Sequence, residues 1–231
     1  TYRLSGQKTW VTMGEKLPYT IVVAKDEDPS RENRNMSLWY IPMDTPGVST
    51  ASLHKIGQQC IPFCEVYLDD VVLTEDQRMG EPGKGFMMLM KNFEVERSFI
   101  VAEQVGLAQA ALEDAAKYAN QRIAFGKPIS RFQLNSLKIT EMCIKLTNMR
   151  NMLYEAAWMA DNNGGDFDPA MAAMCKYYCA NASFEVTDDA MQVMGGIAVA
   201  SEHRINRIWR DLRVDRVSGG TDEMMILTTA K

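Results

Sequence analysis

The sequence predicts an α+β fold in which an antiparallel β-domain, residues 1–82, precedes an up-and-down α-helical bundle, residues 83–231. Three observations support this prediction. Short β-rich runs separated by turn residues recur through the first third of the chain. The glycine- and proline-rich segment Gly80–Gly85 then interrupts the pattern, and beyond it the period of the apolar residues changes from about 2 to about 3.6.

The β-rich runs are short and regularly spaced, which favours an antiparallel sheet system or a small barrel. We expect strands at Thr9–Thr12, Tyr19–Ala24, Met36–Ile41, Cys64–Leu68 and Val71–Leu73. Turns are expected at Ser5-Gly6, Asp28-Pro29-Ser30, Pro46-Gly47 and Asp69-Asp70.

A long helix is expected after the Gly80–Gly85 segment, because apolar residues recur along one of its faces. This stripe comprises Val105, Ala108, Ala111, Leu112, Ala115, Tyr118 and Ala119. Two further helices are expected at Arg131–Asp161 and Pro169–Met194, and Gly195-Gly196 is expected to close the second of them.

Composition and charge exclude several classes of partner. The 231 residues carry a net charge of −5, so no basic surface is expected for nucleic acid or anionic lipid. The sequence has no signal peptide and no run of about eighteen apolar residues, which predicts a soluble, cytoplasmic protein with no membrane partner. Both ends look cut, since Thr1 lies just before a turn and the short helical run Met224–Lys231 has no stop signal, so we expect more chain on each side.

The five cysteines are expected to be reduced thiols, because an odd number scattered along the chain does not suit a disulfide framework. Cys175 and Cys179 lie one helical turn apart, a spacing that suits either a metal or two small core residues. Because His54 and His203 are the only histidines, the core interpretation is favoured and no metal site is expected.

Four short segments combine glycine, glutamine, arginine and aromatic residues in a distinctive order. They are Gly6-Gln7-Lys8-Thr9-Trp10-Val11-Thr12, Asn120–Ile129 with Gln133, Gln192-Val193-Met194-Gly195-Gly196, and Gly220-Thr221-Asp222-Glu223. In order and approximate spacing these segments resemble motifs of the acyl-CoA dehydrogenase family, and the resemblance runs from Gly6 to Lys231. It implies the middle and C-terminal domains of that family, FAD as the cofactor and a homotetramer.

The resemblance also implies which residues contact FAD. Trp10, Val11 and Thr12 would lie against the flavin, and Arg122, Phe125 and Gln133 would meet the FAD of a neighbouring subunit. The diphosphate and further contacts would come from Gln192, Val193, Met194, Gly195, Gly196, Thr221 and Glu223. An arginine fork suits a diphosphate, and a glycine pair lets backbone amides approach a phosphate closely.

Each of these residue types also has an ordinary structural interpretation. Trp10 could be a core aromatic residue, and Arg122 could pair with a surface carboxylate. Gly195-Gly196 could simply end a helix. The common order of the four segments favours the functional interpretation of each.

The catalytic base is the most informative residue to assign. Oxidising an acyl thioester between its α and β carbons needs a carboxylate that removes the α-proton, and in most of the family this glutamate precedes Gly-Thr, where Gly219 stands here. A smaller branch of the family places the base in a Glu-Arg pair after a Gly-x-Gly-Phe start, which Gly83–Phe86 followed by Glu96 and Arg97 resembles. The resemblance implies Glu96 as the base and Arg97 as a substrate contact, although Glu94, Glu96 and Arg97 could also form a solvated helix face.

The resemblance implies an oxidoreductase that interconverts a short acyl-CoA and its 2,3-enoyl-CoA, with an electron-transfer flavoprotein as redox partner. The amino-acid sequences of residues 151–158, 173–181 and 209–220 are most similar to those of family members in bacterial carnitine metabolism that act on crotonobetainyl-CoA. Two alternatives stay open. One is a general short- or branched-chain acyl-CoA dehydrogenase, and the other is a family member that has lost catalysis and serves as a binding protein.

Overall fold

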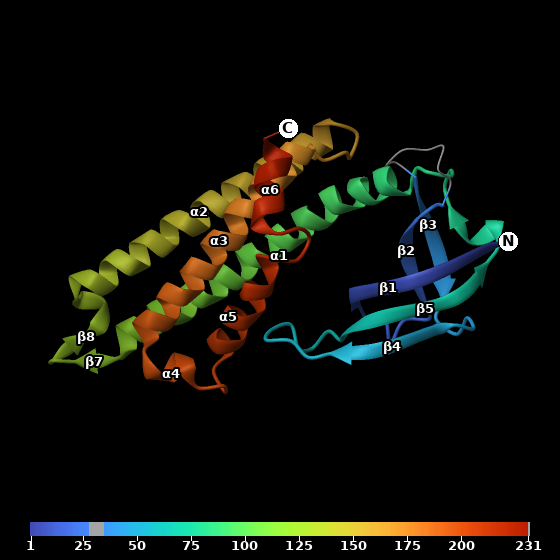
Figure 1. Cartoon of the computed structure of the whole chain (residues 1–231). Helices are drawn as coiled ribbons and strands as arrows, with labels where there is room; N and C mark the ends of the chain where they lie inside the picture. Colours follow the sequence, from blue (N-terminus) through green and yellow to red (C-terminus); the bar gives the residue numbers. More distant parts are fainter. Residues whose placement is uncertain (28–34, 231) are drawn as a thin grey trace. The chain divides into compact units, whose positions relative to one another are not determined.

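A computed structural model describes residues 1–27 and 35–230. The chain folds into two compact units, Thr1–Asn92 and Phe93–Lys231. The predicted fold class is confirmed, because antiparallel strands dominate the first unit and helices the second (Figure 1). The domain boundary expected after residue 82 stays a prediction, and the expected turn at Asp28-Pro29-Ser30 lies outside the described residues.

In the described part of the first unit, two three-stranded antiparallel sheets have the orders β1-β5-β4 and β2-β3-β6. The strands are β1 (Tyr2–Thr12), β2 (Tyr19–Lys25), β3 (Met36–Pro42), β4 (Val48–Leu53), β5 (Phe63–Leu73) and β6 (Arg78–Met79), with a 3₁₀ turn at Glu75–Gln77. Alternate residues of β2, β3 and β5 point inward and build one core between the sheets. Its buried members are Val22, Trp39, Ile41, Cys64, Val66, Leu68, Val71 and Leu73.

Two expected turns were wrong, because Ser5-Gly6 lies inside β1 and Asp69-Asp70 lies inside β5. Asp70 has a positive φ of 49°, and the register between β1 and β5 shifts opposite it, between Leu4 and Gly6. Aspartate tolerates this left-handed conformation, so the two acidic residues form a β-bulge and the ladder continues beyond them. β4 was not predicted, because Val48–Leu53 is rich in Ser, Thr and Ala and is mostly exposed.

The second unit is a helical bundle with a small two-stranded hairpin (Figure 1). Its elements are β7 (Ile123–Ala124), β8 (Lys127–Pro128), a 3₁₀ turn (Ile129–Arg131), α2 (Gln133–Asn162), α3 (Pro169–Met194), α4 (Gly196–Val199), α5 (Arg204–Asp215) and α6 (Asp222–Thr229). Helix α1 (Gly85–Gln121) begins in the first unit and contributes most of its length to the second.

The predicted apolar stripe of α1 packs into the core of the second unit. Ala108, Ala111, Ala115 and Ala119 are fully buried there, and Val105, Leu112 and Tyr118 pack against them. Helix α2 begins at Gln133, two residues later than expected, because Ile129–Arg131 forms a 3₁₀ turn. No helix in the described ranges has both the length and the apolarity required to traverse a bilayer.

Helix α3 has the bounds that the sequence predicts, and its end signals explain them. Asp168 Oδ1 accepts a hydrogen bond of 2.7 Å from the backbone N–H of Met171, and Pro169 occupies the first helical position. Gly195, with a φ of 65°, ends the helix. Helix α3 contacts α2, α5 and α6 and lies at the centre of the bundle.

Candidate functional site

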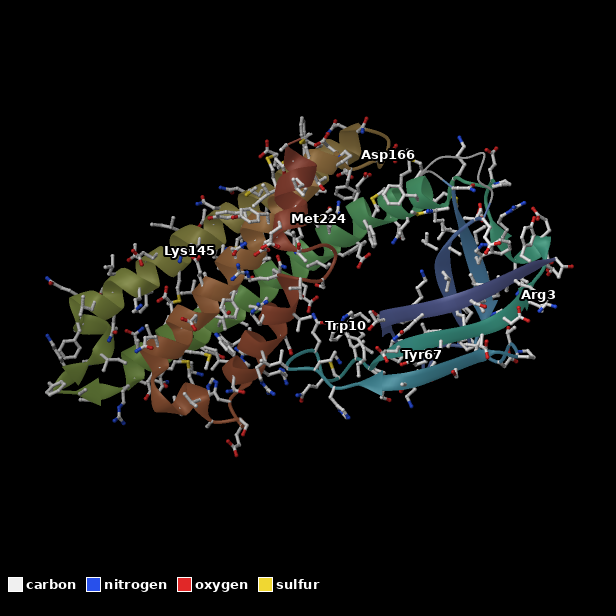
Figure 2. The ribbon with its side chains drawn as sticks, viewed as in Figure 1. Arg3, Trp10, Tyr67, Lys145, Asp166 and Met224 are labelled. Atoms are coloured by element: carbon white, nitrogen blue, oxygen red, sulfur yellow. The ribbon has the colours of Figure 1, made fainter. Side chains whose placement is uncertain are left out.

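Trp10 lies near the end of β1 and is not a core residue of its unit. Trp10, labelled in Figure 2, is 59% exposed. Its ring meets the Phe63 ring edge-on, with 6.4 Å between the ring centroids. The register between β1 and β5 shifts between Lys8 and Val11, so Trp10 sits in an irregularity of the ladder. Val11 is half-buried and Thr12 is exposed, which leaves the indole and the Thr12 hydroxyl open for contact with a ligand.

Two of the residues predicted to contact FAD have left-handed backbone conformations. Trp10 has a φ of 60° and Phe125 a φ of 49°, and the Phe125 side chain is 96% exposed. A bulky aromatic residue in this region costs roughly 1–3 kcal/mol, and such outliers cluster at functional sites. Exposing a large aromatic surface in a strained conformation stabilises neither unit, so both side chains are suited to contact with something outside their own unit.

The hairpin after α1 brings together the second set of predicted residues. The backbone N–H of Arg122 donates to the Tyr118 carbonyl at 2.8 Å, and the Arg122 carbonyl accepts from the N–H of Ile129 at 2.9 Å. Within residues 1–27 and 35–230, no carboxylate forms an ion pair with the exposed Arg122 guanidinium. The surface ion pair considered from the sequence is therefore not found among the residues that the structure describes. Gln133, also exposed, begins α2 directly beyond the hairpin.

The α3–α4 junction lies at the same end of the bundle as the hairpin (Figure 1). Val193 and Met194 are buried, so only their backbone groups are available to a ligand, whereas Gln192 is exposed. The expected helix stop is present, since Gly195 caps α3, and a Cβ added at Gly195 or Gly196 would meet no atom within 4 Å. The glycines thus combine a structural stop with an open backbone surface.

Glu96 is half-buried on α1, not part of a fully solvated face. Burial raises the pKa of this carboxyl group, and the neighbouring Arg97 partly offsets the rise. A carboxylate whose pKa lies above its usual range is a stronger base than an ordinary surface glutamate. Burial lowers the pKa of the Arg97 guanidinium, and the charges of Glu94 and Glu96 partly offset this decrease.

Arg97 connects α1 to the segment where most of the family carries its base. Its side chain is buried, and Nε donates a hydrogen bond of 3.1 Å to the carbonyl of Gly219. A Cβ added at Gly219 would lie 2.9 Å from Cδ1 of Ile100, which is four residues after Glu96 and so on the same helix face. The structure therefore places Gly219 over the face of α1 that carries Glu96.

Thr221 and Glu223 lie at the start of α6, where they also serve the helix. The hydroxyl of Thr221 accepts from the backbone N–H of Met224 at 3.4 Å and caps the helix. The pKa of the exposed Glu223 carboxyl is lowered by hydrogen bonds from its own backbone and from Thr221. Their contact with FAD stays a prediction.

A buried ionic cluster beside this segment was missed in the sequence. Lys176 of α3 is fully buried and donates a hydrogen bond of 2.6 Å from Nζ to the Gly220 carbonyl. Asp215, at the end of α5, is buried beside Gln104, whose Nε2 donates to Oδ2 at 3.4 Å. A lysine within the apolar run of α3 is the signal that could have identified the cluster.

The cysteines of α3 are core thiols. Sγ of Cys175 contacts the Met152 carbonyl at 3.4 Å, and Sγ of Cys179 contacts the Met149 carbonyl at 3.9 Å. Burial raises the pKa of Cys175 to about 11 and that of Cys179 to about 12, so neither is a reactive thiolate at neutral pH. Searched over the described residues, the chain holds no cluster of three His, Cys, Asp or Glu side chains suited to a metal ion.

Family models identify both parts of the chain. Residues 1–71 match the acyl-CoA dehydrogenase middle domain, and residues 83–231 match the acyl-CoA dehydrogenase C-terminal domain. The chain belongs to the acyl-CoA dehydrogenase family. Solved structures agree with this assignment of the acyl-CoA dehydrogenase fold over 99% of the chain.

Three of these structures illustrate the similarity. An acyl-CoA dehydrogenase from Slackia heliotrinireducens is 37% identical with a TM-score of 0.88, and the match covers 59% of that protein. Butyryl-CoA dehydrogenase from Megasphaera elsdenii is 31% identical, with a TM-score of 0.92 and the same coverage of 59%. A glutaryl-coenzyme A dehydrogenase is 30% identical, with a TM-score of 0.93 and 57% coverage. The chain thus spans less than two thirds of the length of these relatives.

Proposed function

We propose that the full-length protein is an FAD-dependent acyl-CoA dehydrogenase or enoyl-CoA reductase in which Glu96 is the catalytic base. The observation that carries this proposal is the placement of Gly219 over Ile100, on the face of α1 that holds Glu96. A carboxylate at either position would approach the same region from a different backbone site. The glycine at the usual base position is therefore compensated by a half-buried glutamate nearby.

The chemistry requires a base that is ionised yet strong enough to remove an α-proton. Burial raises the pKa of Glu96, which strengthens it as a base, and the Arg97 charge keeps the carboxylate form accessible. Arg97 itself is held by the Gly219 carbonyl, so it fixes the helix face from which Glu96 acts. FAD supplies the hydride acceptor of such a reaction when it is bound.

The residues predicted for FAD fit such a group. Trp10 and Phe125 offer exposed aromatic faces at strained backbone positions. Arg122 offers a guanidinium for a phosphate, and Gly195-Gly196 offers backbone with no side chain in the way. Each of these sets suits a different part of a large aromatic and phosphate-bearing cofactor.

The substrate that we propose is a short acyl-CoA, with crotonobetainyl-CoA and γ-butyrobetainyl-CoA as the first pair to test. The similarity to a butyryl-CoA dehydrogenase supports a short acyl chain. An electron-transfer flavoprotein is the proposed redox partner. In support, a structure described as an electron-transferring flavoprotein of Acidaminococcus fermentans matches this chain at 28% identity with a TM-score of 0.92.

A homotetramer is the proposed assembly, and the surface of α2 supports self-association. Large apolar side chains lie along one broad side of this helix at spacings that follow the helical period. They are Leu134, Leu137, Ile144, Tyr154 and Trp158, each more than half exposed. An apolar strip of this kind marks a protein interface more often than a solvated surface.

A second candidate function is a family member that binds acyl-CoA or a partner without catalysis. Gly219 favours this alternative, because the usual carboxylate is missing from that position. The raised pKa of Glu96 argues against it, since a binding protein has no need of a strengthened base.

The Glu96→Gln variant of the full-length protein tests the proposal. We expect FAD content to stay normal and the rate of anaerobic flavin reduction by acyl-CoA to fall by roughly a hundredfold to ten-thousandfold, because no carboxylate removes the α-proton. Glu94→Gln is the matched control and should stay close to the wild type, since a residue two positions away points to another face. Near-normal flavin reduction in Glu96→Gln would reject Glu96 as the base. A wild-type protein that binds acyl-CoA but never bleaches would favour the binding protein.

A further inference from the structure

Two cations from two different helices hold the consecutive carbonyls of Gly219 and Gly220. Arg97 Nε of α1 donates to the first at 3.1 Å, and Lys176 Nζ of α3 donates to the second at 2.6 Å. Hydrogen bonds from charged donors are roughly twice as strong as those between neutral groups. The segment between α5 and α6 is thereby tied at adjacent peptide groups to α1 and to α3.

The two glycines need such support because their backbone is unusual. Gly219 has a φ of 61° and Gly220 a φ of 107°, conformations that a chain with side chains rarely adopts. Glycine also has the largest choice of alternative conformations, so hydrogen bonds to the carbonyls of a glycine pair help to select one geometry. Loss of the hydrogen bond from Arg97 or from Lys176 would let the peptide groups of Gly219 and Gly220 rotate more freely.

Lys176 is an unusual residue to bury at this place. It is fully buried, and the charged groups that face it are Asp215 of α5, Asp222 of α6, Arg97 of α1 and Arg216 just after α5. The two carboxylates attract its charge and the two guanidinium groups repel it, so the surroundings do not clearly favour a buried cation. An apolar residue of similar length would fill the space without this desolvation cost.

We propose that Lys176 is a positioning residue for the reaction. Its hydrogen bond fixes the Gly220 carbonyl and so the position of the adjoining Gly219. The Gly219 carbonyl in turn accepts a hydrogen bond from Arg97, which lies on the turn of α1 that carries Glu96. This inference rests on the proposed function of Glu96. Lys176 is buried beneath the segment and acts through Gly220, with no contact to the reacting atoms.

The protonation of Lys176 gives the proposal a distinctive signature. Burial lowers the pKa of its ammonium group to about 8, so above that pH the donor becomes a neutral amine. A neutral amine makes a weaker hydrogen bond to the Gly220 carbonyl. The rate of flavin reduction should therefore decline as the pH rises above about 8, separately from any loss at acidic pH when Glu96 itself becomes protonated.

The test compares Lys176→Met with the wild type in the full-length, FAD-loaded protein. We expect an unchanged KM and FAD content, and flavin reduction slower by roughly tenfold to a hundredfold, because a small misplacement of the base is costly. The decline above about pH 8 should disappear, since the group that titrates is gone. Lys145→Met removes a lysine of α2 that pairs with Glu185 at the surface and should keep both the rate and the pH profile of the wild type.

A second variant keeps Lys176 in place and covers the case in which Lys176→Met fails to fold. The Asp215 charge raises the pKa of Lys176, so Asp215→Asn should move the alkaline decline to lower pH. An unchanged rate and profile in Lys176→Met, or an unmoved decline in Asp215→Asn, overturns the positioning role. These failures are distinct from failure of the proposed function, which would appear as normal flavin reduction in Glu96→Gln.

Discussion

Moving the carboxylate from Glu96 back to position 219 tests whether the two sites address the same substrate carbon. The double variant Glu96→Gly, Gly219→Glu should recover part of the activity that Glu96→Gly alone loses. Recovery should be incomplete, because a base misplaced by about 1 Å costs on the order of a hundredfold in rate.

The structure adds a stability cost to this exchange. The left-handed backbone at Gly219 costs any other residue about 1–2 kcal/mol, and its new Cβ would press on Ile100 Cδ1, which lies 2.9 Å away. Ile100 Cδ1 is the flexible end of its side chain, so the contact can be relieved by a small shift. Glycine inside α1 at position 96 costs a further ~1 kcal/mol. The double variant should therefore lose about 2–3 kcal/mol of unfolding free energy.

Two single substitutions separate strain from chemistry. Gly219→Ala introduces the strain without a carboxylate and should lower the stability by about 1–2 kcal/mol in denaturant unfolding. Gly106→Ala lies within α1, where a Cβ meets nothing within 4 Å, and should instead stabilise by about 0.5–1 kcal/mol. Equal stability of the two alanine variants would refute the strain argument. Flavin reduction no faster in the double variant than in Glu96→Gly would refute the shared geometry.

Two further predictions concern stability. Burial raises the pKa of Asp215 from 3.8 to about 7, so between these values the folded state binds more protons than the unfolded state. The free energy of unfolding should therefore fall as the pH rises through this window. Urea unfolding at pH 5 and pH 7.5 should show this loss of stability in the wild type and a smaller loss in Asp215→Asn. Asp168→Ala removes the N-terminal cap of α3 and should lower the free energy of unfolding by about 1 kcal/mol. An unchanged urea midpoint would instead show that Pro169 alone fixes the start of the helix.

The sequence was sufficient to predict the fold wherever local signals agree. The bounds of α3 follow from Asp168 and Pro169 at one end and Gly195 at the other, and the structure has the same bounds. The signals at Asp69-Asp70 were ambiguous, because two acidic residues suit a turn and a bulge equally well. Only the pairing with β1 decides between them, and that partner lies more than sixty residues away.

The candidate site was inferred from the resemblance more than from local pattern, and its residue roles stay predictions. Glu96 and Arg97 form part of a sequence motif. The hydrogen bond from Arg97 to the Gly219 carbonyl shows which distant segment lies beside that motif, and residue spacing in the sequence does not predict this contact. Lys176 could not be assigned in this way, because lysines in helices usually reach solvent. Its burial depends on α5 and α6, which follow it in the chain and cover this part of α3.

The central place of α3 has a consequence for local opening of the protein. Its neighbours α2, α5 and α6 shield it within the bundle, so its backbone amides can reach solvent only when much of the second unit opens. We therefore expect the amides of α3, the helix that carries the buried Lys176, to be among the slowest to exchange in the second unit. The desolvation free energy of Lys176 therefore lowers the stability of the whole cooperative unit, and fraying of a single helical turn cannot relieve it.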